Sequence, residues 1–592
     1  MAYIIDQFMW GYQQFFQISL QHYAERLFEK IDPYLKPRIF LVGVLCKDLK
    51  NRHQICLEPE DCGYSQADFA KVNELASQLE VVDAETRIRH SHPVAQENHD
   101  RSIKLNARRD AIVKTIERDS QYDDILTYSS YPVEKDGYLV FIIMQIKKLA
   151  YESHYRLTKD KFNDRYNIST SLINSIIYEF LNLSSSELYV PDSGASMQFT
   201  KREGDELIRA AGKNFMYSIA SKGNNIEGLH GLYEACNIIS SLKYEGEEGV
   251  GGLIVAPKDH QNIKMTLILD TPIAISEYRK VRKFLELSDP IHYLISDSCY
   301  IFGLGQIVEH YNPIMEDLMV VRFTKHYHWE VSHADTCMMR VAYNQPHLPG
   351  TKLRREKLYS DVARIFSGIK KTDIDNLWTV INEAMKQKHG TMIVVSSGAE
   401  EEAKRLRNQS FNIVPEKLDM ALVVKATSID GSIIMSPDGV CHAIGAILDG
   451  IATAKGDSSR GARYNSAIRY YESSKNKYAC FIIIVSEDGM VDIMPNLMPQ
   501  IKRSSINEMI EKLNAFSQSK EELSIKTFNQ MMEWLEQHKF YLSSEQCEQI
   551  NKLRLDIEKI IERQSHSGFI RIVRNDLKPN PEMNDSYFVD KN

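Results

Sequence analysis

The sequence has no long apolar run, no excess of basic residues and no closely spaced cysteine pairs that would mark a disulfide framework. Apolar stretches such as Tyr138–Ile146 fall well short of the roughly 18 residues that a membrane span needs. The N-terminal residues lack the basic segment of a signal peptide. The net charge is −8, from 72 basic and 80 acidic residues, which argues against bulk nucleic-acid binding but not against a local basic pocket. We therefore expect a cytoplasmic protein without a membrane span.

Cysteines are few and scattered. There are nine of them, an odd number that fits reduced thiols rather than a disulfide framework. Cys56 and Cys62 lie near His53, but a zinc site needs four ligands at tighter spacing, so we expect no metal there.

The chain is too long for a single hydrophobic core, with 592 residues, so several domains are expected. Apolar patterning, together with the punctuation by Pro346 and Pro349-Gly350, predicts five regions. These are an α/β domain at 1–150, a helical segment at 151–225, a β-rich domain at 226–350, a further α/β domain at 351–515, and C-terminal helices with a disordered tail at 516–592. In the 351–515 region, helices alternate with apolar strands, which favours a mixed central sheet flanked by helices.

In the first 350 residues, an aromatic stripe over residues 4–31 predicts a helix that docks on its own domain. The uniformly apolar Tyr138–Ile146 predicts a central strand. Arg87–Arg109 is expected to be a solvated loop despite three histidines, His90, His92 and His99. A second histidine group could ligate a metal, although exposed strand histidines are commoner. It comprises His326, His328 and His333.

Beyond residue 350, Asp375–Lys388 is predicted to be a helix that Gly390 ends as a left-handed cap. Apolar strands are predicted at Met392–Val395, Met420–Lys425 and Cys480–Val485. Near the C-terminus, Ser543 and Gln546 form a predicted capping box. An apolar seam follows it, which fits either a short coiled coil or a helix packed on the preceding domain. The seam consists of Ile550, Leu553, Ile557 and Ile560, and the Pro- and Asn-rich stretch from Asn575 predicts the disordered tail.

Residues 429–488 contain the two parts that a nucleotide site needs, an acid that can bind a metal and a helix N-terminus that can bind phosphate. Asp430-Gly431 opens a β-hairpin, offering an acid for a metal and a glycine that permits close approach. Ser458–Gly461 opens a helix whose free backbone N–H groups suit an anion. Arg460 and Arg463 are spaced so that both guanidinium groups can reach one phosphate chain. A buried strand then delivers Ser486-Glu487-Asp488 at its carboxyl end.

The order and spacing of these segments resemble the diadenylate cyclase domain family over roughly residues 353–505. Asp430 and Gly431 match its Asp-Gly-Ala motif, with Ser432 in place of alanine. Gly461 and Arg463 match its Gly-x-Arg-His-Arg motif. Ser486-Glu487 match its third motif, a Ser-Glu-acidic turn after an apolar strand. Two positions depart from the family, because Tyr464 and Asn465 stand where His and Arg are usual. Arg460, one turn earlier, could supply the missing charge.

The resemblance implies that two ATP molecules are condensed into cyclic di-AMP, with release of two pyrophosphates. It implies catalytic roles for Asp430, Gly431 and Arg463, and a divalent metal, Mn²⁺ or Mg²⁺, at Asp430 and Glu487. The implied nucleotide-binding residues are Gly431, Ser432, Ser459, Arg460, Gly461, Arg463, Asn465, Ser466 and Glu487.

The reaction also implies a partner, because each ATP must face the other across two copies of the domain in a homo-oligomer. Residues 1–350 resemble, by their position, the sensor modules of such enzymes and would answer to an unknown ligand or protein. The motif departures keep a second hypothesis open, a catalytically inactive adenine-nucleotide sensor. A third is a scaffold that acts through its first 350 residues.

Overall fold

The computed structural model describes residues between 7 and 589, and these form two compact units that divide after Pro349. The residues outside its description are 1–6, 48–51, 84–85, 87, 119–123, 164–165, 196–203, 309–310, 335, 350–352, 354, 386–389, 454–455, 457–460, 487–490, 519–524, 565–573 and 590–592.

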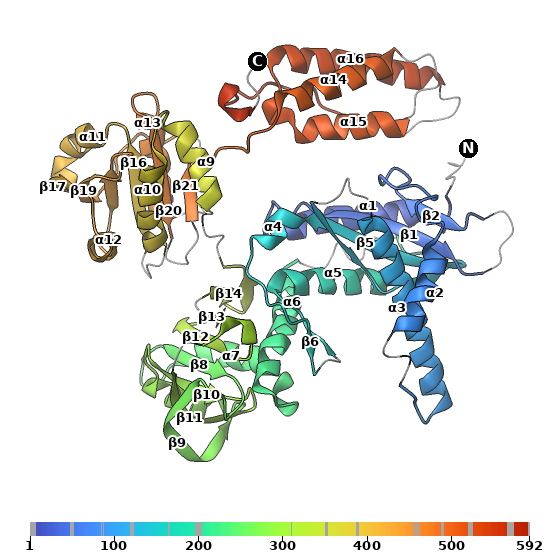
Figure 1. The fold of residues 1–592 in the computed structure, drawn as a ribbon, viewed down its shortest axis with the longest axis horizontal. Coiled ribbons are helices and arrows are strands. Elements are labelled where there is room, and N and C mark those ends of the chain that lie inside the picture. Colours follow the sequence, from blue (N-terminus) through green and yellow to red (C-terminus); the bar gives the residue numbers. More distant parts are fainter. Residues whose placement is uncertain are drawn as a thin grey trace. The chain divides into compact units, whose positions relative to one another are not determined.

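The first unit begins with an antiparallel sheet covered on both faces. Its strands are β1 (Arg38–Leu45), β2 (Ile55–Glu58), β3 (Ile125–Ser129), β4 (Val133–Lys135) and β5 (Tyr138–Lys147), in the order β2-β1-β5-β3 with β4 also on β5. Because strand side chains alternate between faces, Ile39 and Leu41 pack with helix α1 (Gln13–Glu29) and α5 (Leu172–Leu188). Phe40 and Val42 pack on the other face with α2 (Val72–Val82) and α3 (Pro93–Glu117) (Figure 1).

Two expectations for this region change, and one is confirmed. Strand β5 is central, as its apolar sequence predicts. The aromatic helix begins only at Gln13. The predicted solvated loop at 87–109 is wrong over most of its length, because Pro93 starts a 25-residue helix. Proline at the first helical position is pre-organised for helix, and Ala111, Ile112 and Ile116 bury its inner face.

The remainder of the first unit is an eight-stranded sheet with helices beside it. Helices α4 (Lys148–Glu152), α6 (Gly204–Ala220) and α7 (Leu232–Ser241) precede the sheet, and α8 (Tyr278–Phe284) is inserted within it. A short two-stranded ribbon, β6 (Lys161–Phe162) with β7 (Tyr166–Asn167), lies between α4 and α5. The sheet order is β15-β14-β13-β12-β8-β10-β11-β9. Its strands are β8 (Gly251–Val255), β9 (Ile263–Ala274), β10 (His292–Ser296), β11 (Tyr300–Ile307), β12 (Met319–Lys325), β13 (His328–His333), β14 (Thr336–Ala342) and β15 (Gln345–His347).

The second unit is built on a mixed central sheet, as the sequence predicts, and this sheet has six strands in the order β17-β19-β18-β16-β20-β21. Its strands are β16 (Thr391–Ser396), β17 (Phe411–Glu416), β18 (Ser432–Met435), β19 (Cys441–Ala446), β20 (Cys480–Val485) and β21 (Val491–Met494). One face packs against α9 (Arg355–Ile365), α10 (Lys371–Ala384) and α12 (Met420–Thr427). The other packs against α11 (Ala399–Arg405) and α13 (Ala462–Ser474). The fold is therefore α/β, with helices on both faces of the sheet (Figure 1).

Two local predictions in this unit are wrong. The predicted strand at Met420–Lys425 is helix α12, because Asp419 caps it by accepting a hydrogen bond from the Leu422 backbone N–H, a contact that favours helix over strand. Helix α10 ends at Ala384, so Gly390 is not its cap, and Gly390 does not adopt a positive φ. A different reason for glycine at position 390 appears at the site below.

The C-terminal helices α14 (Arg503–Ser517), α15 (Ile525–Gln537) and α16 (Ser544–Gln564) share their own core. The capping box is confirmed, with the Gln546 N–H donating to the Ser543 hydroxyl over 3.2 Å. Ile550 and Ile557 are buried within this helical group. The stretch 574–589 departs from the expected disorder, because Tyr587 and Phe588 are buried in the same core.

Candidate nucleotide site

Three strand ends of the six-stranded sheet meet at one edge. Strand β16 runs parallel to β18, with Met392 opposite Ser432, and antiparallel to β20, with Thr391 opposite Val485. The residues that precede β16 and β18 therefore lie beside the residue that follows β20. In order across the edge they are Asp430, Gly390 and Ser486.

Gly431 fixes the backbone next to Asp430. It adopts a φ of 110°, and a Cβ placed on it would lie 2.6 Å from the carbonyl carbon of Gly445 in β19. Glycine at position 431 therefore makes room for the neighbouring strand β19, whereas the sequence suggested that it makes room for a ligand. The Asp430 side chain is 90% exposed, so its carboxylate faces solvent and is accessible to a metal ion or a nucleotide.

Arg463 is the cation that reaches Asp430. Its Nη2 donates to Asp430 Oδ1 over 2.9 Å. A Cβ on Gly390 would lie 2.7 Å from Arg463 Nη1 and 3.1 Å from the Val485 carbonyl oxygen. Glycine at position 390 therefore makes room for the guanidinium group. Sequence reasoning missed this role, although a glycine directly before a buried strand, with no turn to require it, was a usable signal.

Helix α13 presents Arg463 from its first turn. The helix begins at Ala462, and its N-cap residue is Gly461, which has an extended backbone and no side chain that could cap the helix. The N–H groups at this end thus have no side-chain acceptor from the N-cap residue, which suits an anion. The macrodipole of the helix adds positive potential at the same end.

Of the remaining predicted nucleotide-binding residues, some have contacts within the fold and others lie outside the described residues. Ser432 is buried and its hydroxyl donates to the Ala446 carbonyl oxygen over 3.0 Å, so that hydroxyl is engaged in the sheet. The Asn465 amide donates to the Gly461 carbonyl oxygen over 3.3 Å, and Ser466 is half-buried on α13. Three candidates, Ser459, Arg460 and Glu487, lie outside the described residues.

A partly buried polar network that the sequence did not reveal holds α13 in place. The Tyr470 hydroxyl donates to Glu402 Oε2 over 3.0 Å, and Glu402 is almost fully buried. Arg405 contacts Glu402 and also forms a forked ion pair with Asp449, at 2.6 and 2.8 Å. The hydrogen bonds from Arg405 lower the pKa of the Asp449 carboxyl. The helix that carries Arg463 is thus tied to α11 and to the loop after β19.

The residues present fit a divalent metal of the Mg²⁺ or Mn²⁺ type. Such ions bind one or two protein carboxylates and take the remaining ligands from phosphate and water. Asp430 supplies one exposed carboxylate at the edge where β20 also ends. Over the described residues, no group of three or more His, Cys, Asp or Glu side chains could hold a metal by itself. Among the described residues, Asp430 would therefore hold such an ion only together with ligands from outside this set.

The alternative metal candidates are explained by other contacts. His333 is fully buried and bonds the Tyr155 hydroxyl through Nδ1 over 2.6 Å. His326 lies in the turn between β12 and β13, so it does not share a strand with His328. Cys56 and Cys62 are buried, and neither they nor the other seven cysteines form a disulfide in the structure.

Family comparisons divide the chain into three matched regions. Residues 379–497 match the family model described as DisA bacterial checkpoint controller nucleotide-binding, DAC. Residues 9–216 match the probable sensor domain DACNG, and residues 230–335 match the probable sensor domain DACNH. No curated protein matches the chain.

Among solved structures, the chain is similar to a hypothetical membrane spanning protein from Bacillus cereus, at 22% identity and a TM-score of 0.18. The match covers 23% of this chain and 65% of that one. In the parts of this chain that the structure describes, no helix is long and apolar enough to cross a membrane.

The Asp430–Arg463 edge lies inside the 379–497 match, on the sheet that the family resemblance predicts. The chain thus carries a DAC-type nucleotide-binding domain at residues 379–497, preceded by two probable sensor domains, DACNG and DACNH.

Proposed function

We propose that this protein is a diadenylate cyclase, which condenses two ATP molecules into cyclic di-AMP and two pyrophosphates. The observation that carries the proposal is the ion pair between Asp430 and Arg463 at the strand edge of a DAC-family domain. In each half-reaction, the 3′-hydroxyl oxygen of one ATP forms a bond to the α-phosphorus of the other. The bond from that phosphorus to the β-phosphate bridging oxygen breaks, and the hydroxyl proton is lost.

Asp430 is assigned to the attacking hydroxyl. A secondary hydroxyl is a weak nucleophile near neutral pH, so it gains from a carboxylate that accepts a hydrogen bond or the proton itself. Mg²⁺ or Mn²⁺, held by Asp430, by Glu487 and by the triphosphate, would polarise the α-phosphate and lower the pKa of the hydroxyl. The exposed position of Asp430 suits such shared use by metal and nucleotide.

Arg463 and the start of α13 are assigned to the triphosphate. The guanidinium group now paired with Asp430 can exchange that partner for phosphate oxygens, which accept its forked donors. Together with the N–H groups after Gly461, it would stabilise the charge that builds up on the departing pyrophosphate. Arg460 is assigned to the same phosphates.

A second copy of the domain is part of the proposal, because each ATP supplies the nucleophile for the other. Exposed apolar side chains surround the Asp430 edge and would be covered by such a face-to-face partner. Phe411 and Ile447 are more than 60% exposed. The side chains of Phe411 and Ile429 each come within 3.4 Å of the position that a Cβ on Gly445 would occupy. Patches of this kind on a domain surface often mark protein interfaces.

The sensor domains would regulate this encounter in response to a ligand or partner. A catalytically inactive adenine-nucleotide sensor remains the second candidate, favoured by Asn465, whose amide bonds its own helix in place of a second phosphate-binding cation.

The experiment that tests the proposal incubates the purified protein with ATP and either Mn²⁺ or Mg²⁺, and separates the nucleotides by chromatography. We expect cyclic di-AMP from the wild-type protein, its loss on chelation with EDTA, and none from Asp430→Asn. ATP binding is measured in parallel by calorimetry. Binding without product in either metal, at concentrations where the protein is dimeric, would refute the cyclase and leave the sensor. The isolated fragment 351–515 would then show whether the first unit represses an active domain.

A further inference from the structure

His333 is a fully buried histidine whose two ring nitrogens are both hydrogen-bonded. It ends strand β13 and is 0% exposed. Its Nδ1 lies 2.6 Å from the Tyr155 hydroxyl, and its Nε2 lies 3.3 Å from the Tyr311 hydroxyl. Its cross-strand neighbours, Met319 in β12 and Thr336 in β14, carry no charge. A neutral imidazole has one donor and one acceptor nitrogen, whereas an imidazolium has two donors, so the two tyrosines decide which form fits.

The contacts of Tyr311 assign the ring proton of His333. The Tyr311 oxygen accepts the backbone N–H groups of Asp317 and Leu318, over 3.1 and 3.3 Å, and its hydroxyl donates to Asp317 Oδ1 over 3.1 Å. That hydroxyl has a single hydrogen, and a charged carboxylate attracts it more strongly than a neutral ring nitrogen. We therefore assign the ring proton to Nε2, which leaves Nδ1 to accept from the Tyr155 hydroxyl.

A second proton on His333 would disturb this arrangement. An imidazolium donates from both nitrogens, so the Tyr155 hydroxyl would have to turn its hydrogen away from Nδ1. Among the residues that the structure describes, both ring contacts of His333 are to hydroxyl groups and neither is to a carboxylate. A charge in such surroundings costs free energy because it is removed from water. Burial accordingly lowers the pKa of the His333 imidazole.

The charged groups around His333 act in opposite directions. Glu316 and Asp317, in the loop before β12, favour its protonation, and Lys222, in the turn after α6, opposes it. Asp317 also pairs with His260 Nε2 over 3.2 Å, so its attraction is shared with another donor. The effect of burial on His333 is larger than the effect of any of these charges.

The hydrogen bond between Tyr155 and His333 joins the two sensor regions. Tyr155 lies in segment 153–160, inside the DACNG match, and His333 lies inside the DACNH match, as does the loop 311–318. Both regions belong to the first compact unit. The bond therefore contributes to how firmly one sensor region is held on the other.

Further contacts between the same two segments centre on Glu316. Its carboxylate accepts the Thr158 N–H and hydroxyl and the Lys159 N–H, at 2.6 to 3.0 Å. The Lys159 ammonium group donates to the Met315 carbonyl oxygen over 2.6 Å. Glu316 adopts a φ of 49°, a conformation that persists in a residue other than glycine only where the surroundings hold it. Segment 153–160 is thus attached to the DACNH region by polar contacts that can open.

We propose that the hydrogen bond between Tyr155 and His333 is a pH-sensitive contact that couples the DACNG and DACNH regions. While the ring is neutral, it accepts the Tyr155 hydroxyl and holds segment 153–160 in place. When the segment detaches, the ring reaches solvent and takes up a proton below about pH 6.5, the ordinary pKa of histidine. Because the closed form has the lower pKa, the contact is stable above that pH and weakens as the pH falls below it.

The test measures hydrogen–deuterium exchange of the full chain by mass spectrometry, at about pH 7.5 and about pH 5.5, after correction for the intrinsic effect of pH on exchange. Peptides that cover 153–160 and 311–318 report local opening. If only the open form takes up the proton, at a pKa of about 6.5, the opening equilibrium rises by up to about tenfold at the lower pH. We expect wild-type exchange in these peptides to accelerate by up to the same factor.

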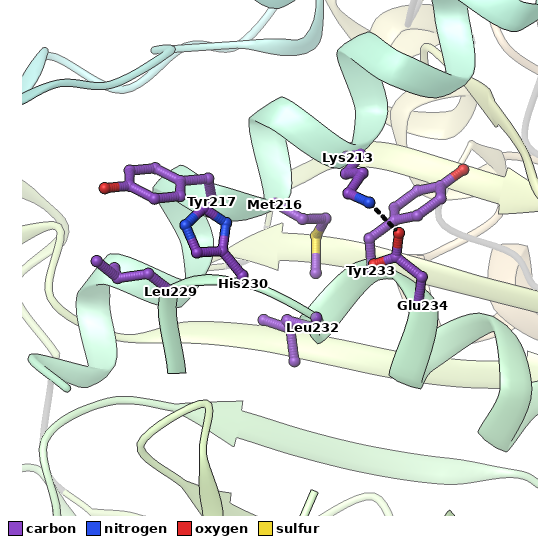
Figure 2. A pocket seen from close by; sticks show the side chains of 9 residues that line it. Lys213, Met216, Tyr217, Leu229, His230, Leu232, Tyr233 and Glu234 are labelled. Atoms are coloured by element: carbon purple, nitrogen blue, oxygen red, sulfur yellow. Dashed lines mark ion pairs between the residues drawn. The ribbon is translucent and has the colours of Figure 1, made fainter. Parts of the chain in front are cut away.

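Two histidine variants locate the response. His333→Gln keeps a polar side chain but cannot take up a proton, so its corrected exchange should be equal at both pH values. His230→Gln is the matched control, because His230 also lies against a tyrosine, Tyr217, with ring centroids 5.3 Å apart, but is exposed in a pocket between α6 and α7 (Figure 2). It should respond to acid as the wild type does.

Tyr155→Phe keeps the proposal testable if His333→Gln does not fold. Tyr155 is 37% exposed, and the variant removes only the hydroxyl group. Its 153–160 peptide should exchange about fivefold faster than wild type at the higher pH, the factor that one typical hydrogen bond contributes. Three results would overturn the proposal: equal wild-type exchange at both pH values, an acid response that His333→Gln retains in full, or wild-type exchange in Tyr155→Phe. None of them depends on cyclase activity, because these residues lie outside the DAC domain.

Discussion

Gly390→Ala is the sharpest perturbation of the nucleotide site, because it adds a single carbon beneath Arg463. That Cβ would lie 2.7 Å from Arg463 Nη1, whereas an ordinary contact is about 3.5 Å,. The guanidinium group must therefore move by about 0.8 Å. The contact with the Val485 carbonyl oxygen, at 3.1 Å, is tight but tolerable. Since position 390 does not need a positive φ, the methyl group stresses Arg463 and little else.

The expected magnitudes follow from this geometry. Loss of glycine entropy in the unfolded chain would stabilise the protein by about 0.4–1 kcal/mol, which roughly offsets the strain at Val485, so the Tm should change by no more than about 2 °C. Misplacing a phosphate-binding group by close to 1 Å can cost about 10²-fold in rate. We therefore expect kcat to fall by about 10- to 100-fold and the affinity for ATP to fall by about 10-fold.

The assay is a double-mutant cycle with Arg463→Ala, with ATP affinity measured by calorimetry and the Tm by a thermal melt. If Gly390 acts through Arg463, adding Gly390→Ala to Arg463→Ala should change the affinity by less than about 0.5 kcal/mol. A full loss of affinity in that background, or wild-type affinity and rate in Gly390→Ala alone, would refute the assignment of position 390 to the guanidinium group.

Three further predictions concern the parts that support the site and the sensor. Tyr470→Phe removes a donor to the buried Glu402 and should destabilise the second unit by about 1–2 kcal/mol in a denaturant melt, with a smaller effect if Arg405 compensates. Burial raises the pKa of Glu58 to about 7, above its unfolded value. The folded first unit then holds a proton that the unfolded chain has lost, and its stability should fall by about 3 kcal/mol as the pH rises from 4.5 to 7. Glu58→Gln should flatten that profile, and an unchanged slope would assign it to other groups. Arg554→Met breaks the contacts of the buried Arg554 with Asp576 and with the backbone of residues 574 and 575, so limited proteolysis should cut the 574–589 stretch faster than in wild type.

The sheets of this protein could be predicted where strand sequences are uniformly apolar. Tyr138–Ile146 and Cys480–Val485 are buried strands, as their composition indicates. The prediction failed at Met420–Lys425, where the apolar run is compatible with either a helix or a strand. The contact that decides for the helix is a single capping hydrogen bond, from the Leu422 backbone N–H to the Asp419 side chain. It also failed at the C-terminal tail, where composition argued for disorder. Leu577, Tyr587 and Phe588 are buried in the core of the C-terminal helices and anchor that otherwise largely exposed stretch.

The catalytic candidates divide in the same way. Asp430 and Arg463 could be selected from the sequence because each stands in a motif with a fixed local sequence, and the structure places the two side chains within hydrogen-bond distance of each other. The role of Gly390 was missed, although a glycine directly before a buried strand was a usable signal, because that role comes from an arginine on α13, far along the chain. A local sequence motif can identify which side chain has a suitable functional group. Whether that group can reach a ligand depends on neighbouring residues that are known only from the fold. Both the motif and the fold are needed to understand this site. The motif has Asn465 where the family usually has arginine, so phosphate binding would depend more strongly on Arg463, and Gly390 leaves the space that the Arg463 guanidinium group occupies.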